Sequence, residues 1–459
     1  MSWETVIGLE IHVQLSTKSK LFSGGSTEFG AESNTHVDLI DMGLPGVLPV
    51  ANKEAFYKAI RFGLATGANI NQTSSFDRKN YFYPDLPKGY QITQMTQPIV
   101  EKGSIKIAVD DYEKEINITR AHLDEDAGKS IHDMFEGETG VDLNRAGTPL
   151  LEIVSEPEIS NAKEAVAYFK AIRQLVTFLD ICDGNMAQGS MRCDANVSVR
   201  KIGEEKLGTR TETKNVNSFR FVEKAIQYEI ERQIHEIESG NEITQETRLY
   251  DPEKNETRSM RSKEEAHDYR YFPCPDLLNI ELERGGVDKI RDDLPELPDQ
   301  KKLKFINDFN ITPYDAEVII AEQVTAEFFE AIATNTDGKI AANLLINELF
   351  GRLNKDNLSF KENPITVKQM RELIDLIKLD KISSKGSKEI FDHIWKSGGN
   401  PAELVNELGL EQVQDTGLIE KIVDAEGHVG FDVTPNVVPT MRYLLPPKPI
   451  ITAENAVSY

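Results

Sequence analysis

The amino-acid sequence predicts an α+β protein in which a strand-rich region precedes an all-helical region and a short, atypical tail. Two segments of the first half alternate apolar and polar residues with the period of two that is typical of half-buried strands. From residue 293 the apolar residues recur instead at three- and four-residue spacing, as in amphipathic helices. After about residue 427, five prolines fall close together, and no helix continues through such a run. These observations predict domains at residues 1–292, 293–400 and 401–459, with the last truncated or divergent after about residue 427.

Composition limits the class of protein. The chain has 459 residues, of which 39% are hydrophobic and 28% charged, so it is long enough for several globular domains. Its net charge of −24 argues against binding to nucleic acid through overall charge, so any such contact must be local. Three cysteines without CxxC spacing suggest neither a disulfide framework nor a thiolate zinc site. Without a secretory signal or an apolar membrane span, we expect a cytoplasmic protein.

Two strands are the most regular elements of the first half. Residues Thr5 to Leu15 alternate so that Glu10 and His12 share one face, opposite a row of aliphatic residues. Residues 191–200 alternate in the same way and place Asp194 on a polar face.

A hairpin and a further strand are also predicted. Residues 104–126 form two alternating arms that turn near Asp110 and Asp111. The second arm delivers four polar side chains to one end, namely His122, Asp124, Glu125 and Asp126. The apolar run PLLEIV is a strand that contains Glu152, and a buried carboxylate must be paired, protonated or bound to a metal.

Helices are predicted where apolar residues follow the helical period. One covers residues 162–179, with Ser160 as its N-cap, and another covers residues 219–237. Thr366 and Gln369 have the spacing of a capping box before a third helix.

The common nucleotide and hydrolase motifs are missing. AGKS at residues 127–130 is not a phosphate loop, because Leu123 stands where that loop needs glycine. No GxGxxG, HExxH or GxSxG occurs in the sequence.

The acidic residues near the strand ends are the strongest candidates for chemistry. Several carboxylates that converge on a divalent ion can activate ATP without a phosphate loop. The members of this set are Glu10, Glu152, Asp194, Glu212 and the run 124–126. Structural ion pairs are the alternative, and the acidic run is expected to be solvated surface. An imidazole such as that of His12 suits Mn²⁺ or Zn²⁺ better than Mg²⁺.

Residues 76–94 combine basic and aromatic side chains. Lys79 and Lys88 flank Tyr81 and its aromatic neighbours, and prolines and glycine interrupt regular structure. Such a loop suits binding of an anion and stacking on a base, although a packed surface loop explains it nearly as well. Residues 269–272 form a similar cluster, YRYF.

Long stretches of the chain resemble the B subunits of glutamyl/aspartyl-tRNA amidotransferases. They include ETVIGLEIHVQL, FDRKNYFYPDLPKGYQITQ, RAHLDEDAGKS, VDLNRAGTPLLEIVSEPEI, GSMRCDANVSVR and DYRYFPCPDLL. The similarity covers almost the whole first half and continues more weakly to about residue 423, whereas the segment after about residue 427 lacks it.

The resemblance implies a cradle-like kinase domain, followed by helical domains, that uses ATP and Mg²⁺. It would phosphorylate the side-chain carboxylate of Glu or Asp misacylated on tRNA(Gln) or tRNA(Asn). Ammonia from a glutaminase A subunit would then displace the phosphate, in a heterotrimer that also contains a C subunit and does not involve a membrane.

The resemblance also implies roles for individual residues. Mn²⁺ or Zn²⁺ are alternatives to Mg²⁺, and the implied metal ligands are His12 and Glu125, with Glu10, Asp194 and Glu212 around the ion. Lys79 and Lys88 would hold phosphate or the substrate carboxylate, Tyr81 would contact the nucleotide, and Glu152 would orient the metal ligands.

Two other functions stay open at this point. A catalytically silent subunit for RNA binding or assembly would use the same acids as structural ion pairs. A stand-alone ligase for a small acid is disfavoured, because the long helical region would then have no evident role.

Overall fold

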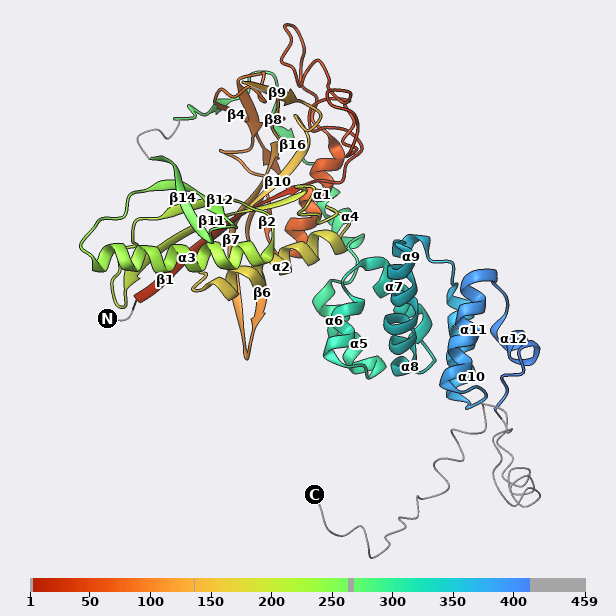
Figure 1. Ribbon diagram of the computed structural model, residues 1–459. Helices are drawn as coiled ribbons and strands as arrows, with labels where there is room; N and C mark the ends of the chain where they lie inside the picture. The colour runs from red at the N-terminus through yellow and green to blue at the C-terminus, as the bar shows by residue number, and fades with distance from the viewer. Residues whose placement is uncertain (1–2, 136, 263–267, 413–459) are drawn as a thin grey trace, which may run out of the picture. The chain divides into compact units, whose positions relative to one another are not determined.

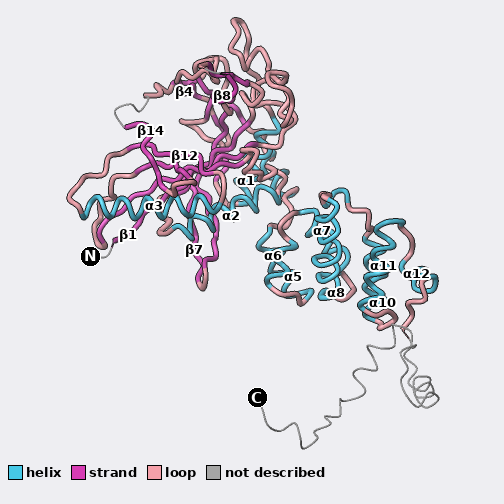
Figure 2. The backbone as a smooth tube through the Cα atoms, viewed as in Figure 1, coloured by secondary structure: helices cyan, strands magenta, loops and turns pink. Residues whose placement is uncertain are grey.

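The structure is a computed structural model that describes residues 3–135, 137–262 and 268–412. The chain divides into two compact units, Met1–Pro298 and Asp299–Tyr459. Figure 2 shows that strands dominate the first unit and helices the second, which confirms the predicted α+β class. The finer division at residues 292 and 400 stays a prediction, and the segment after about residue 427 lies outside the described residues.

The first unit is built mainly from strands. Its longer strands are β1 (Trp3–Gln14), β6 (Val100–Val109), β7 (Tyr112–Glu125), β8 (Lys129–Phe135), β10 (Pro149–Ser155), β11 (Met191–Lys201) and β14 (Glu256–Ser262). Its shorter strands are β2 (Asn69–Ile70), β3 (Thr73–Ser74), β4 (Asp77–Asn80), β5 (Tyr90–Thr93), β9 (Glu138–Asp142), β12 (Thr211–Val216), β13 (Glu246–Asp251), β15 (Phe272–Pro273) and β16 (Ile280–Glu281). Its helices are α1 (Lys53–Ala65), α2 (Ala162–Phe178), α3 (Phe219–Glu238) and α4 (Gly286–Asp292).

Strand β1 lies at the centre of a large mixed sheet. It pairs antiparallel with β10 on one side and with β11 on the other, and β10 pairs in turn with β7. The path continues through β12, β13 and β14 on one side and through β5, β4 and β15 on the other. The predicted strands around Glu10, Asp194 and Glu152 are therefore confirmed, as is the hairpin of β6 and β7 that turns at Asp110 and Asp111.

The two faces of this sheet differ in character. Ile7, Leu9 and Ile11 of β1 are fully buried on one face. Helices α2 and α3 contact each other; α2 packs against β6 and β1, and α3 packs against β11, β12 and β14 (Figure 1). Because side chains alternate along a strand, the polar residues between these aliphatic positions lie on the opposite face.

The position at which helix α2 begins corrects one sequence prediction. Helix α2 begins after Asn161, whose side chain accepts a hydrogen bond from the Glu164 N–H, so Asn161 and not Ser160 is the N-cap. Ser160 instead donates its backbone N–H to Glu164 and accepts a hydrogen bond from Lys114. Helices α1 and α4 were not predicted from the sequence.

The second unit is helical throughout its described part. Its helices are α5 (Pro298–Phe309), α6 (Pro313–Ile319), α7 (Gln323–Ala333), α8 (Gly338–Asn343), the π-helix η2 (Leu344–Leu349), α9 (Phe350–Asp356), the 3₁₀-helix η3 (Phe360–Glu362), α10 (Val367–Lys378), α11 (Ser384–Ser397) and α12 (Pro401–Glu407). Buried Phe305 and Phe329 pack edge to face in its core. The capping box of Thr366 and Gln369 is confirmed at the start of α10. Among the described helices, none has the length and apolar character needed to cross a bilayer.

Candidate active site

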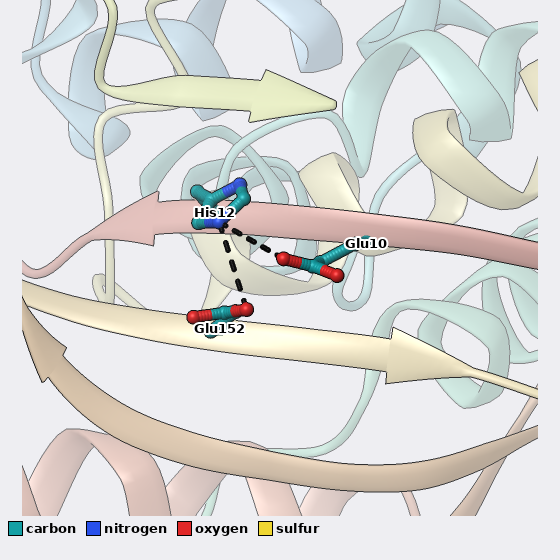
Figure 3. Close-up of side chains that lie close together, drawn as sticks. All are labelled: Glu10, His12 and Glu152. Atoms are coloured by element: carbon teal, nitrogen blue, oxygen red, sulfur yellow. Dashed lines mark ion pairs between the residues drawn. The ribbon is translucent and has the colours of Figure 1, made fainter. Parts of the chain in front are cut away.

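A row of ionisable side chains crosses the polar face of the sheet. The strand register places His12 of β1 opposite Glu152 of β10, and Glu152 opposite His122 of β7. Opposed residues of paired strands project to the same side, so the three side chains meet. Glu10 joins them because it lies two residues before His12 on the same face of β1. Figure 3 shows Glu10, His12 and Glu152 pointing toward one another.

The distances in this row bring carboxylate and imidazole atoms close together. Nε2 of His12 lies 3.5 Å from Oε1 of Glu10 and 3.8 Å from Oε1 of Glu152. Nε2 of His122 lies 3.3 Å from Oε2 of Glu152. Glu152 is therefore flanked by two imidazoles, and it is 7% exposed, as the sequence suggested for a carboxylate in an apolar strand.

These side chains form two overlapping groups with the donor atoms of a metal site. In the group of Glu10, His12 and Glu152, one potential ligand atom of each residue lies within 4.8 Å of the others. His122, Asp124 and Glu152 form a second such group that shares Glu152. Carboxylate oxygens suit Mg²⁺, and the imidazole also suits Mn²⁺ or Zn²⁺, so both groups fit a divalent cation.

The proximity of these groups changes their protonation. Burial and the neighbouring Glu152 carboxylate raise the pKa of Glu10 to about 7. Burial opposes the charged form of His12, but the carboxylates of Glu10 and Glu152 raise its pKa to about 9. Although burial also opposes ionisation of Glu152, the two imidazoles hold its pKa well below the ordinary value. In Glu10, burial and the repulsion from Glu152 therefore outweigh the favourable contact with His12.

The row opens on a cavity of about 370 Å³ within the first unit. Its lining residues are mostly charged, polar or aromatic: Glu10, Lys79, Met95, Arg120, Glu152, Asn196, Arg210, Glu212, Lys214, Gln245, Glu246, Thr247, Tyr269 and Tyr271. Four of these side chains are cationic and four are acidic. A cavity of this composition suits a ligand that carries phosphate or carboxylate groups together with a cation.

On one side of the cavity the charges already neutralise one another. Nζ of Lys214 lies 2.8 Å from Oδ2 of Asp194 and 2.9 Å from Oε1 of Glu212. Thr247 donates a hydrogen bond of 3.0 Å to Glu212. Asp194 and Glu212 are thus joined through Lys214, which the sequence analysis did not single out.

Lys79 lies on the other side with a different set of neighbours. Its ammonium group is 5.0 Å from the ring centroid of Tyr269, and within the described residues it forms no ion pair. Although burial opposes its charged form, the nearby carboxylates of Asp124 and Glu152 raise the pKa of Lys79 above its usual range. Lys79 therefore stays protonated beside the cavity.

Tyr81 belongs to the same aromatic group. Its ring packs edge to face against Tyr269, at 5.9 Å between centroids, and against Tyr83, at 5.8 Å. Burial raises the pKa of the Tyr81 phenol, and the acidic neighbours add to this effect. Tyr81 thus supports the wall of the cavity from behind and is not among the residues that line it.

Lys88 and Glu125 lie apart from the His12 group. They form an ion pair with each other in which both side chains are almost fully buried, and Ile92 donates its backbone N–H to Glu125 at 2.8 Å. Neither residue lines the cavity or belongs to the two groups of potential ligands among the described residues. Lys79 lies in β4, whereas Lys88 lies in the loop before β5.

The acidic run at 124–126 is buried and not solvated, contrary to the sequence expectation. Each of its three side chains is at most 4% exposed. Asp126 accepts hydrogen bonds from Gln14 at 2.8 Å and from Arg192 at 3.0 Å. Burial raises the pKa of Asp124 to about 8, although Lys79 opposes this shift. The run enters the sheet at the end of β7, where neighbouring strands exclude water.

Several cavity residues escaped the sequence analysis, notably Arg120, Arg210, Tyr269 and Tyr271 as members of one site. His122 and Asp124, which group with Glu152, were by contrast indicated by the predicted hairpin arm. No local pattern connects residue 269 with residue 79, because β15 pairs with β4 only in the folded sheet.

Comparison with known proteins gives two family matches. A model described as "GatB/GatE catalytic domain" matches residues 5–288, and a model described as "GatB domain" matches residues 327–425. The B subunit of the aspartyl/glutamyl-tRNA(Asn/Gln) amidotransferase of Azotobacter vinelandii is 58% identical over 427 residues, which cover 92% of this chain and 89% of the relative.

B subunits from two other organisms are similar to this chain to nearly the same degree. The corresponding B subunits of Thioalkalivibrio sulfidiphilus and Alkalilimnicola ehrlichii are each 56% identical over 427 residues, with 92% of this chain covered and 90% and 89% of the relatives. With the cavity and its charged residues inside the region that matches the catalytic-domain model, the chain belongs to the family of aspartyl/glutamyl-tRNA(Asn/Gln) amidotransferase B subunits.

Proposed function

We propose that this chain activates the side-chain carboxylate of Glu or Asp misacylated on tRNA(Gln) or tRNA(Asn) by ATP-dependent phosphorylation. Family membership makes it the B subunit of a tRNA-dependent amidotransferase, a ligase that forms Gln-tRNA(Gln) or Asn-tRNA(Asn). The activated acyl phosphate would react with ammonia from a glutaminase A subunit, and a C subunit would complete the heterotrimer. We place this reaction in the cytoplasm.

One observation carries the proposal: a charged lysine and an incompletely neutralised carboxylate cluster line the same cavity. Lys79 forms no ion pair in the part of the chain that the structure describes, so its charge is available to an anionic ligand. Arg120 and Arg210 line the same cavity and likewise form no ion pair among the described residues. Phosphoryl transfer to a carboxylate brings several negative oxygens together and needs such cations.

The carboxylates and imidazoles would hold the divalent cation that accompanies ATP. We assign Glu10, His12 and Glu152 to this role because their ligand atoms already lie within 4.8 Å of one another. Asp194 and Glu212 would complete the surroundings, with Lys214 as their counter-ion. When bound, Mg²⁺, or Mn²⁺ or Zn²⁺ in its place, supplies positive charge that neutralises phosphate oxygens.

The remaining predicted residues would act around this centre. Lys79 would bind a phosphate or the substrate carboxylate, and Tyr81 would support the aromatic wall against which the nucleotide lies. We keep Lys88 and Glu125 as candidates, although in the structure each is neutralised by the other. They would take part only if that ion pair opens when the partner subunits and substrates bind.

A hydroxamate assay tests the proposal. This chain is assembled with its A and C subunits, supplied with ATP, Mg²⁺ and glutamyl-tRNA(Gln), and given hydroxylamine without an ammonia source. Glutamyl hydroxamate that depends on both ATP and charged tRNA is the expected product, because hydroxylamine attacks an acyl phosphate. If no hydroxamate forms while the complex still assembles, the alternative of a catalytically silent RNA-binding or assembly subunit replaces the proposal.

A further inference from the structure

The last residue of β4, Asn80, binds a segment that is remote in sequence and forms one wall of the cavity. Its backbone N–H donates a hydrogen bond of 2.9 Å to the carbonyl oxygen of Tyr269. Its side-chain amide donates to the same carbonyl at 3.1 Å and to that of Arg270 at 2.9 Å. Asn80 thus holds two successive carbonyls, yet it does not itself line the cavity.

The segment that Asn80 holds has an unusual local conformation. Arg270 has a φ of 44°, in the left-handed region that residues other than glycine rarely adopt. Its N–H donates a hydrogen bond to the Asp268 side chain at 3.1 Å. Such a conformation costs free energy and persists when surrounding contacts fix it.

This conformation presents two aromatic rings to the cavity. Tyr269 and Tyr271 both line it, with ring centroids 5.9 Å apart in an edge-to-face arrangement. The ring of Tyr269 also contacts the ammonium group of Lys79, the residue that precedes Asn80 in β4. The end of β4 therefore sets both the position of the wall formed by Tyr269 and Tyr271 and the position of the charged Lys79.

We propose that Asn80 is a positioning residue that fixes the Tyr269–Tyr271 wall and thereby sets the affinity of the cavity for the nucleotide. An aromatic wall beside a cation suits a nucleoside triphosphate, because the rings contact the base or ribose while the cation binds phosphate. The inference rests on the proposed ATP-dependent activation, which it deepens by assigning a second segment of the chain to nucleotide binding.

The most informative substitution is Asn80→Asp. It preserves size and the backbone hydrogen bond but replaces the amide donor by a carboxylate oxygen that faces two carbonyl oxygens. Asn71→Asp is the matched control, because the Asn71 amide also donates to a carbonyl, that of Pro98 at 2.7 Å, and does not line this cavity.

Two measurements are made on the enzyme assembled with its partner subunits. The first follows the ¹⁹F resonances of fluorotyrosine at Tyr269 and Tyr271, which Tyr→Phe variants identify. We expect Asn80→Asp to shift both resonances and Asn71→Asp to leave them in place. Unchanged resonances in Asn80→Asp overturn the inference, whether or not the complex uses ATP.

The second measurement is the KM for ATP in the hydroxamate assay. We expect Asn80→Asp to raise this KM about tenfold and to change kcat by less than about twofold, as the loss of ligand positioning implies. In a Tyr269→Leu background, Asn80→Asp should add almost nothing, because both changes act through one wall. A full, multiplicative effect in that background contradicts the inference. If the wild-type complex itself forms no hydroxamate, the proposed function fails, and the resonances alone decide the role of Asn80.

Discussion

The buried carboxylates of Glu229, in helix α3, and Glu152, in strand β10, have very different partners. Glu229 of α3 forms ion pairs with Arg232 at 2.8 Å and with Arg248 at 2.9 Å. It also accepts hydrogen bonds from Thr211, at 2.8 Å, and from Thr257. Thr211 and the cavity residue Glu212 are adjacent on β12 and project to opposite sides of the sheet, and Arg248 also pairs with Glu246, which lines the cavity.

The cluster around Glu152 is not neutralised in this way. Its nearest ionisable partners are two imidazoles at 3.3 and 3.8 Å, and a second carboxylate, Glu10, belongs to the same group. A fully paired buried charge fixes the structure, whereas repulsion between nearby carboxylates costs stability unless a ligand relieves it. From this difference we infer that the Glu229 cluster serves folding, and we propose that the Glu152 cluster serves binding and chemistry.

The largest effect is expected when the carboxylate of Glu229, the central charge of its cluster, is removed. Glu229→Ala leaves Arg232 without its buried partner and Arg248 with Glu246 alone, and it should lower the free energy of unfolding by about 3–5 kcal/mol. Denaturant unfolding measures this change. The exposed Glu231→Ala on the same helix is the control and should cost less than about 0.5 kcal/mol. A small loss for Glu229→Ala would mean that this cluster does not stabilise the fold.

A substitution in the cluster of Glu10, His12 and Glu152 should change activity more than it changes stability. His12→Ala removes a ligand atom from the group with Glu10 and Glu152 and should lower hydroxamate formation about 100-fold, with assembly retained. The control is His132→Ala, because His132 is exposed on β8. His12 would instead have a structural role if His12→Ala lost folding or partner binding while the rate of hydroxamate formation per folded molecule stayed unchanged.

The pH dependence of stability gives a second test of the Glu229 cluster. Although burial opposes ionisation, Arg232, Thr257 and Arg248 lower the pKa of Glu229 below its ordinary value. A lowered pKa in the folded state stabilises the protein above the unfolded-state pKa, and this stabilisation is lost as pH falls through the folded-state pKa. The stability difference between wild type and Glu229→Gln, about 2 kcal/mol at neutral pH, should therefore shrink in acid. A difference that stays constant from pH 7 to pH 3 would contradict this assignment.

Substitution of Lys79 should weaken nucleotide binding, with a smaller effect than the changes above. Lys79→Met keeps the aliphatic stem beside Tyr269 but removes the charge, and it should raise the KM for ATP about tenfold. Lys106→Met, an exposed substitution on β6, should leave the KM unchanged. A KM in Lys79→Met equal to that of wild type would exclude a phosphate-binding role for this lysine.

The sequence predicted the strands of the site better than its contacts. Strict alternation around Glu10 and His12, and one carboxylate in an apolar run at Glu152, were sufficient to identify three members of the cluster, because the period of a strand fixes its faces. The pairing of Glu152 with His122 depends on strand register, which no local pattern supplies.

The two lysines of residues 76–94 illustrate what composition alone misses. They have similar aromatic neighbours in the sequence, yet Lys79 lies beside the cavity while Lys88 is neutralised by Glu125. The N-cap of α2 was misassigned for a related reason, since Ser160 and Asn161 are both good capping residues and only backbone geometry selects between them.

The contrast between the clusters is tested most directly by the same substitution in each. Thermal unfolding is measured for wild type, Glu10→Gln and Glu229→Gln, first with chelator and then with added Mg²⁺. In chelator, Glu10→Gln should be more stable than wild type by about 1 kcal/mol, because it removes repulsion with Glu152, whereas Glu229→Gln should be less stable. Added Mg²⁺ should stabilise wild type and Glu229→Gln but not Glu10→Gln. If Glu10→Gln is destabilised in chelator and Mg²⁺ stabilises all three proteins equally, the Glu10–His12–Glu152 cluster is structural and the account is wrong.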